Sequence, residues 1–172
     1  MSEWVTAFAP ASIGNVAVGF DMLGLALEGV GDRVQARRCD GEGMRIAEVR
    51  GLDGQLHPYL STDAESNTAS IAAKALWDAQ GGQGGVELKV HKGVPLQSGM
   101  GSSAASAVAA VVAVNALLDA PLAPEKLLAY ALIGEQFASG GLHADNVAPS
   151  LLGGLVLCPQ VLLPEIVRVP VP

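Results

Sequence analysis

The sequence has 172 residues, of which 50% are hydrophobic, and its mean hydropathy of +0.38 excludes an intrinsically disordered chain. Ten Lys and Arg residues against 17 Asp and Glu residues give a net charge of −7, so we expect no nucleic acid partner. Cys39 and Cys158 lie far apart, which fits a reduced cytoplasmic protein better than a disulfide scaffold or a zinc site. The first ten residues lack a signal-peptide pattern, and the longest apolar run, residues 107–114, is too short to span a membrane. We therefore expect a compact cytoplasmic domain with no membrane partner.

The first fifty residues predict three strands. Residues 3–8 form a predicted strand that ends at Pro10, and residues 32–39 alternate charged with apolar side chains, as a half-buried strand does. Residues 44–49 repeat this alternation after the turn sequence DGEG. A short glycine-containing turn between two such runs favours a hairpin of these two strands.

A helix, a strand and a buried helix are expected next. Residues 66–82 begin with Ser, Asn and Thr and end in a double glycine, which predicts a capped helix. Residues 85–93 predict a strand with its apolar residues on one face. A helix then begins near Ser102 or Ser103. Its residues 104–114 are almost all Ala and Val, so we expect this helix to be central and buried.

The remaining elements complete an α+β pattern. Pro124 starts an amphipathic helix over residues 125–138, and residues 151–158 form a further apolar strand. The order of strands, helix, strand, two helices and strand predicts an α+β fold. In this fold a mixed or mostly antiparallel sheet carries its helices on one face.

The loop PLQSGMGSSAA, residues 95–105, is the most informative stretch of the chain. Gly99 and Gly101 permit close approach of a ligand to the backbone. The following helix offers unpaired N–H groups and the positive end of its dipole at its first turn. The loop therefore predicts an anion site without Lys or Arg, although serine caps and close packing explain the same residues without any ligand.

Two known phosphate loops can be compared with it. A Walker A loop ends in Gly-Lys-Ser/Thr, and no lysine lies between Lys92 and Lys126. The segment GMGSSA fits the dinucleotide fingerprint G-x-G-x-x-A, with Asp119 at a suitable distance for a ribose contact. That fingerprint requires a second parallel strand after the helix, whereas this sequence predicts another helix. An NAD(P)-dependent oxidoreductase is therefore the less favoured alternative.

Three segments resemble one enzyme family. Residues 95–105 resemble the second signature of the GHMP kinase superfamily, with Met100 in place of the usual Leu. Residues 9–27 and 134–154 resemble the substrate motif and the His-Ala-Asp-Asn segment of the homoserine kinases within it. The resemblance implies a GHMP kinase N-terminal domain, of ribosomal protein S5 domain 2-like fold, over residues 1–158. It also implies ATP-dependent phosphorylation of L-homoserine to O-phospho-L-homoserine, a step of threonine biosynthesis.

The resemblance implies a nucleotide site and a metal site. Ser103 and Glu135 would hold Mg²⁺, which needs few protein oxygens beside phosphates and water. Glu135 taken alone is an ordinary solvated glutamate, and Asn67, placed as an adenosine contact, is equally well explained as a helix cap. The residues that would wrap the ATP phosphates are Pro95, Leu96, Gln97, Ser98, Gly99, Met100, Gly101, Ser102, Ser103, Ala104 and Ala105.

The resemblance likewise implies a homoserine site and a catalytic pair. The substrate-binding residues would be Asn15, Asp21, His143 and Asn146, with Asp21 pairing with the substrate ammonium. Turn formation and helix capping are the alternative explanations for the first three. Asn146 would orient the substrate hydroxyl. Asp145 is the nearest possible base, and we expect it instead to orient the turn 143–146, with its side chain pointing away from the hydroxyl.

The sequence departs from the family after the last predicted strand. Homoserine kinases continue into a second domain with a third glycine-rich motif and arginines for the substrate carboxylate. Here residues 159–172 predict only the start of a linker to such a domain, with Arg168 lacking any motif around it. We expect this chain alone to be inactive or nearly so, and to expose an apolar edge through which it could form a homodimer. A non-catalytic nucleotide-binding module is the alternative function.

Overall fold

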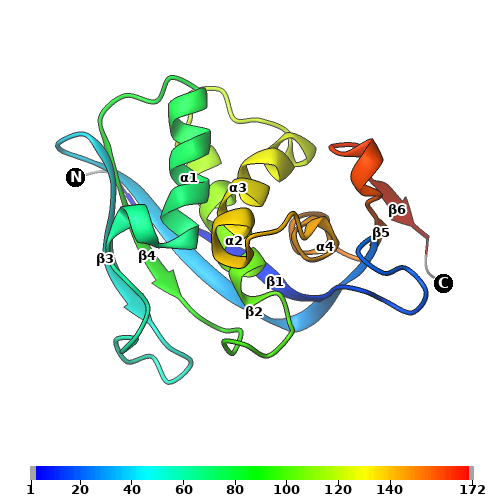
Figure 1. The fold of residues 1–172 in the computed structure, drawn as a ribbon. Coiled ribbons are helices and arrows are strands. Elements are labelled where there is room, and N and C mark those ends of the chain that lie inside the picture. Colours follow the sequence, from blue (N-terminus) through cyan, green and yellow to red (C-terminus); the bar gives the residue numbers. More distant parts are fainter. Residues whose placement is uncertain (1–2, 171–172) are drawn as a thin grey trace.

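The computed structural model describes residues 3–170 and shows one sheet covered by helices on one side (Figure 1). Short 3-10 turns at Ala64–Ser66, Pro124–Leu127 and Gln160–Leu162 connect the main elements. The helices are α1 Thr68–Ala79, α2 Ser102–Asn115, α3 Leu128–Ser139 and α4 Ala144–Leu152. The strands are β1 Val5–Ile13, β2 Leu23–Cys39, β3 Gly43–Arg50, β4 Gly85–His91, β5 Leu155–Leu157 and β6 Val167–Val169. The predicted α+β class with helices on one face is confirmed.

Strand β2 organises the sheet, because it pairs with β1, β4 and β5 along its 17 residues. All three pairings are antiparallel, and the sheet continues from β4 to β3 and from β5 to β6. The predicted hairpin of residues 32–39 with 44–49 is wrong. β4 lies between β2 and β3 and pairs with β3 in parallel, so the sheet is mixed.

Two strand boundaries differ from the prediction. β1 does not end at Pro10 but continues to Ile13, with a register shift between Pro10 and Ser12. Proline is tolerated at such an irregularity because no regular ladder bond needs its missing N–H. β2 begins at Leu23, nine residues before the predicted strand of residues 32–39.

Helix α4 was not predicted. It occupies Ala144–Leu152 and contains Pro149, which weakens its helical pattern in the sequence. The predicted strand over residues 151–158 is therefore too long at its start, and β5 covers only Leu155–Leu157. A short helix before a short strand looks like one apolar run when only the pattern of hydrophobic residues is used.

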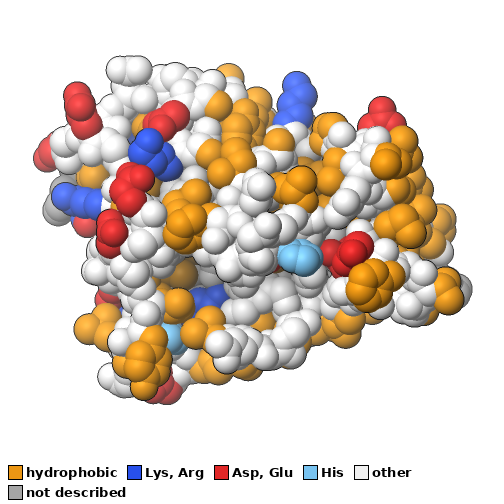
Figure 2. All heavy atoms as spheres, in the orientation of Figure 1, with side chains coloured by type: hydrophobic (Ala, Val, Ile, Leu, Met, Phe, Trp, Pro, Cys, Tyr) orange, Lys and Arg blue, Asp and Glu red, His pale blue; other side chains and the backbone are white. Residues whose placement is uncertain are grey.

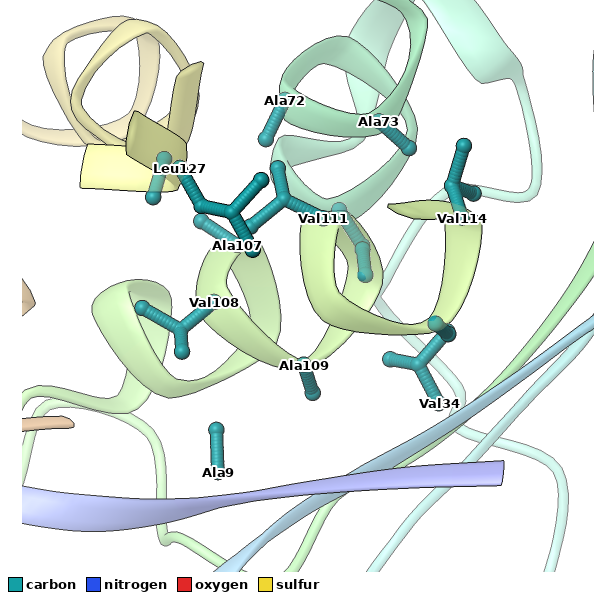
Figure 3. Close-up of a cluster of buried hydrophobic side chains, with 14 of the residues drawn as sticks. Ala9, Val34, Ala72, Ala73, Ala107, Val108, Ala109, Val111, Val114 and Leu127 are labelled. Atoms are coloured by element: carbon teal, nitrogen blue, oxygen red, sulfur yellow. The ribbon is translucent and has the colours of Figure 1, made fainter. Parts of the chain in front are cut away.

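Helix α2 lies at the centre of the core, as its Ala and Val content predicted (Figure 3). Val108 and Ala109 face the sheet near Ala9, and Val111 faces the layer of the other helices. Small side chains keep the helices close. A Cβ atom at Gly134 of α3 would lie 2.8 Å from the Cβ of Ala72 in α1. This packing fixes the axis of α2 and thus the direction in which its N-terminus points.

The segment predicted as the start of a linker contains regular structure. Residues 159–170 include β6, which pairs antiparallel with the preceding strand β5 and extends the sheet. The predicted domain boundary at residue 158 remains a prediction. Residues 1–2 of the predicted domain and residues 171–172 of the predicted linker lie outside the described residues. The face seen in Figure 2 carries scattered Lys and Arg side chains among many apolar ones. None of the helices within residues 3–170 is long and apolar enough to cross a membrane.

Candidate active site

A cavity of about 810 Å³ opens where the loop after β1, the glycine-rich loop, α3 and the start of α4 meet. It draws residues from all three motifs that carried the family resemblance. Residues far apart in the sequence therefore share one surface. The cavity is lined by Gly14, Asn15, Tyr59, Leu96, Gln97, Ser98, Gly99, Gly101, Ser102, Ser103, Glu135, Ser139, His143 and Asn146.

The glycine-rich loop leaves the first turn of α2 bare. Gly101 is the N-cap residue in a left-handed conformation, with φ of 62°, and no side chain caps the helix. A Cβ atom at Gly101 would collide with the Ser12 hydroxyl, so the loop packs directly on β1. The Ser12 amide also donates a 3.1 Å hydrogen bond to the Met100 carbonyl. These contacts present uncapped helix N–H groups, with the positive end of the helix dipole, to the cavity.

Glu135 places a buried carboxylate on the cavity wall. The residue is only 4% exposed, and its Oε2 atom has no hydrogen-bond partner. Burial raises the pKa of the Glu135 carboxyl, while the nearby Ser103 hydroxyl and His143 act in the opposite direction. An unpartnered buried carboxylate oxygen beside a hydroxyl fits a hard divalent cation. Within residues 3–170 no three His, Cys, Asp or Glu side chains gather into a metal site, so such a cation would need further oxygens.

The loop after β1 brings Asn15 to the cavity in a strained conformation. Asn15, Ala17 and Asp21 all have positive φ, of 55°, 50° and 55°. The Asn15 amide N–H donates to Asp145 Oδ2 at 2.9 Å, and Asn15 Oδ1 accepts from the Asp21 amide at 2.9 Å. The Asp21 side chain is exposed and does not line the cavity. Its backbone amide is the group that holds the side chain of Asn15.

The two predicted catalytic residues lie on different sides of the cavity wall. Asn146 lines the cavity, and its Oδ1 accepts a 3.2 Å hydrogen bond from the Ser12 hydroxyl. Asp145 is fully buried behind it, with Oδ2 bonded to Asn15 and Oδ1 unpartnered. The absence of a side chain at Gly14 makes this possible, because a Cβ there would collide with the Asp145 carboxylate.

The position of Asn67 is compatible with both roles considered for it, that of a helix cap and that of an adenosine contact. Its Oδ1 accepts from the Ala69 amide at 3.0 Å as the N-cap of α1, and its Nδ2 donates to the Ser61 carbonyl at 2.8 Å. Asn67 also lines a smaller cavity of about 190 Å³ that shares Leu96 and Ser103 with the larger one. The cap therefore holds the asparagine at the wall of the smaller cavity, which lies beside the larger one.

Four residues predicted to wrap phosphates do not line the cavity. The side chains of Ala104 and Ala105 point into the protein and are fully buried. Met100 packs in a small apolar cluster with Ala105 beneath the loop. Pro95, although exposed, is likewise absent from the residues that line the cavity.

The sequence prediction missed several residues of the site. Gly14, Tyr59 and Ser139 line the cavity, and the exposed Tyr59 lies in a loop that carried no pattern. Lys92 was noted only as the last lysine before a lysine-free stretch, yet its ammonium donates to the Ser102 carbonyl, 2.8 Å away, beneath the first turn of α2. The alternation of the inward residues of β4 continues to position 92, and that signal could have placed this lysine on the buried face.

One family model matches this α+β domain: the model of the GHMP kinases N terminal domain matches residues 67–154. The chain belongs to the GHMP kinase family. It is 54% identical over 88% of its length to a homoserine kinase of Xanthomonas campestris, covering 46% of that protein. A homoserine kinase of Thermoplasma acidophilum is 44% identical over 89% of this chain, and 46% of it is covered.

Solved structures agree with this assignment. The crystal structure of homoserine kinase from Cytophaga hutchinsonii has a TM-score of 0.90 and 44% identity, and the match covers 100% of this chain and 53% of that one. The mevalonate kinase of Methanococcus jannaschii shares the fold at a TM-score of 0.70 and 12% identity, with 99% of this chain and 56% of that one covered. The chain spans about half the length of the curated relatives it matches.

Proposed function

We propose that this chain carries the ATP site and part of the substrate site of a kinase that phosphorylates L-homoserine to O-phospho-L-homoserine in threonine biosynthesis. The main support is that one cavity is lined both by the bare first turn of α2 and by Asn15, His143 and Asn146. The names of the relatives support homoserine as the substrate.

The nucleotide phosphates would bind to backbone N–H groups of the loop 99–105, at the positive end of α2. Ser103 and Glu135 are the residues that would hold Mg²⁺, since they offer a hydroxyl and a free carboxylate oxygen at one wall of the cavity. When bound, the metal would neutralise charge on the transferred phosphoryl group. The adenosine would extend toward Asn67, in the adjoining smaller cavity.

Homoserine is a small zwitterion, and other polar residues that line the same cavity suit it. Asn15, His143 and Asn146 offer amide and imidazole groups for its hydroxyl and polar ends. Asp21, exposed in the same loop as Asn15, would pair with the ammonium group. This set favours homoserine over mevalonate or galactose, which carry no ammonium.

In the reaction the side-chain oxygen of homoserine forms a bond to the γ-phosphorus, and the bond from that phosphorus to the ADP oxygen breaks. The hydroxyl proton leaves late, to an oxygen of the transferred phosphoryl group or to water, because phosphoryl transfer has a loose transition state in most analyses. Asn146 cannot accept a proton at neutral pH, so it would orient the hydroxyl by hydrogen bonding. Asp145 lies behind the cavity wall and would not act as the base.

Two other functions remain to be tested against this one. A non-catalytic nucleotide-binding module would keep the phosphate loop and lose turnover. An NAD(P)-dependent oxidoreductase is disfavoured because α2 leads into the turn Pro124–Leu127 and α3, where the dinucleotide fold needs a parallel strand. A cytoplasmic location and a homodimer stay predictions.

Thermal unfolding with Mg·ATP, NAD and homoserine separates these functions. A ligand at 100 times its Kd stabilises the folded chain by about 2.7 kcal/mol. We expect Mg·ATP to raise the Tm and NAD to leave it unchanged. Homoserine-dependent ADP release, with mevalonate and galactose as controls, then measures turnover, which we expect to be low in this chain. Stabilisation by NAD alone would contradict the proposal, and ADP release with mevalonate in place of homoserine would contradict the substrate.

A further inference from the structure

The Asp32 carboxylate is fully buried within β2 and accepts four hydrogen bonds. Its Oδ1 atom accepts from the backbone amides of Gly93 and Val94, at 2.8 and 3.0 Å. Its Oδ2 atom accepts from the Ser106 hydroxyl at 2.6 Å and from the Lys92 ammonium. One oxygen therefore binds the backbone that enters the glycine-rich loop, and the other binds side chains beneath α2.

Lys92 connects this carboxylate to the far end of the loop. Besides Asp32, its ammonium donates to the Ser106 hydroxyl at 2.7 Å and to the Ser102 carbonyl at 2.8 Å. Ser102 is the first residue of α2, and its own hydroxyl donates to the Val94 carbonyl at 3.0 Å. The chain before the loop and the chain after it are thus held to each other through one buried cluster.

Close backbone packing limits any movement of this cluster. A Cβ atom at Gly93 would collide with the carbonyl oxygen of Gly31, the residue that precedes Asp32. The loop therefore leaves the sheet in direct contact with β2. Lys92 and Ser106 also line the smaller cavity together with Ser103, so the cluster lies immediately beneath the proposed nucleotide site.

The charges of the cluster cancel one another. The Lys92 side chain is only 4% exposed, and burial lowers the pKa of its ammonium, while the Asp32 carboxylate opposes that effect. A buried ion pair contributes little net stability, because desolvation of both charges offsets their attraction. The pair is therefore better explained by the groups that it holds in place, since both charged side chains hydrogen-bond to the chain on either side of the loop.

We propose that Asp32 is a positioning residue, which sets the phosphate-binding geometry of the loop 95–101 by fixing residues on both sides of it. The inference rests on the proposed function, because it takes this loop as the site of the nucleotide phosphates. Asp32 itself does not reach the ligand. It acts through the Gly93 and Val94 amides on one side and through Lys92 and Ser102 on the other.

The variant Asp32→Asn tests this, because it keeps the shape of the side chain and places an NH₂ group toward either the two amides or the Lys92 ammonium. We expect the Kd for Mg·ADP, measured by calorimetry well below the Tm, to rise by about tenfold or more, as for a lost hydrogen bond to a charged group. Hydrogen exchange should become faster in peptides covering residues 93–103. This second readout needs no ligand.

Two further variants make the test specific. Val114→Ala removes buried side-chain atoms at the opposite end of α2 and serves as the stability-matched control, with a Kd within about twofold of the parent chain. Ser106→Ala removes one hydroxyl from the cluster without changing its charge. It should weaken Mg·ADP binding by about threefold or more. Because Ser106 also lines the smaller cavity, faster ligand-free exchange of residues 93–103 in this variant decides the question if Asp32→Asn does not fold.

The outcomes separate this inference from the proposed function. Unchanged Kd and unchanged loop exchange in the folded Asp32 or Ser106 variant would overturn the positioning role alone. Equal Kd losses in Val114→Ala would do the same, because they would show a general effect of stability. If the parent chain binds no Mg·ADP, the proposed function fails, and faster loop exchange in the variants still shows whether Asp32 orders the loop.

Discussion

The Asn15 amide donates a 2.9 Å hydrogen bond to the Asp145 carboxylate, across 130 positions of the sequence. This bond joins the first motif of the chain to the third. Asn15 sits in a left-handed conformation that costs conformational energy in a non-glycine residue. A fully buried carboxylate on its N–H is a strong means of holding that conformation, because hydrogen bonds to charged acceptors exceed neutral ones.

The first prediction follows from this bond. Asp145→Ala removes the acceptor, so the Asn15 loop should loosen and the Kd for homoserine should rise by about tenfold or more in the Mg·ADP complex. The Kd for Mg·ADP should change by less than about twofold, since Asp145 lies outside the cavity wall. Calorimetric titration of each ligand measures both values.

Asp145→Asn is the matched control, because its amide oxygen can still accept from Asn15. We expect it to bind homoserine nearly as well as the parent chain. A fall in any residual homoserine phosphorylation by the 10² to 10⁴ typical of a lost acid–base group would instead make Asp145 the base.

The second prediction concerns Asp21. Its backbone amide holds the Asn15 side chain, and this bond survives a change of the Asp21 side chain. Asp21→Asn removes only the negative charge, so it should weaken homoserine binding by about tenfold and leave Mg·ATP binding unchanged. The comparison of the two dissociation constants is the measurement. Equal effects on both ligands would place Asp21 outside the substrate site.

Local patterns in the sequence predicted the buried α2, the cap at Asn67 and the class of the fold. They were sufficient there because each depends on side chains close in sequence, such as the Ala and Val run that only a central helix can bury. They failed for the partner of β3 and for the extension of β1 past Pro10. Both depend on which strands pair with each other, and that choice is made by contacts distant in sequence.

The candidate site shows the same division. The motifs placed Asn15, Glu135 and Asn146 on one cavity, because their residue types carry the resemblance. The sequence offered no pairing of Asp32 with Lys92, which are 60 positions apart and meet only when β2 and β4 are neighbours in the sheet. Buried polar clusters of this kind depend on sheet register, so they become visible only in the structure.

The third prediction tests the bare first turn of α2. Gly101→Ala places a Cβ against the Ser12 hydroxyl at a position with φ of 62°. Gly81→Ala is the control, because Gly81 also has positive φ, of 66°, its Cβ would meet open space, and it does not line the cavity. Each change should cost about 1–3 kcal/mol of backbone strain. Only Gly101→Ala should add a collision, which shifts the loop and weakens Mg·ADP binding. Urea unfolding and calorimetry measure the two effects, and equal loss of binding in both variants would refute the role of the collision.

The last prediction is that the ionised Glu135 carboxylate lowers the stability of the metal-free chain and binds the metal when it is present. Burial raises its folded pKa above the ordinary value of 4.5, so the unfolded chain loses this proton at lower pH than the folded chain. The stability contributed by this group is therefore full below pH 4.5 and falls as the pH rises, until the folded pKa is passed. Glu135→Gln cannot ionise, so in the absence of metal it should unfold at a higher urea concentration than the parent chain at pH 7, and lose this advantage at pH 4. The same variant should lose the additional Tm increase that Mg²⁺ gives with ATP, because a neutral amide is a poor ligand for a hard cation. A Glu135→Gln chain that is less stable than the parent at pH 7 would show that the buried carboxylate does not lower stability. A variant that keeps the full response to Mg²⁺ would show that Glu135 is not the metal ligand.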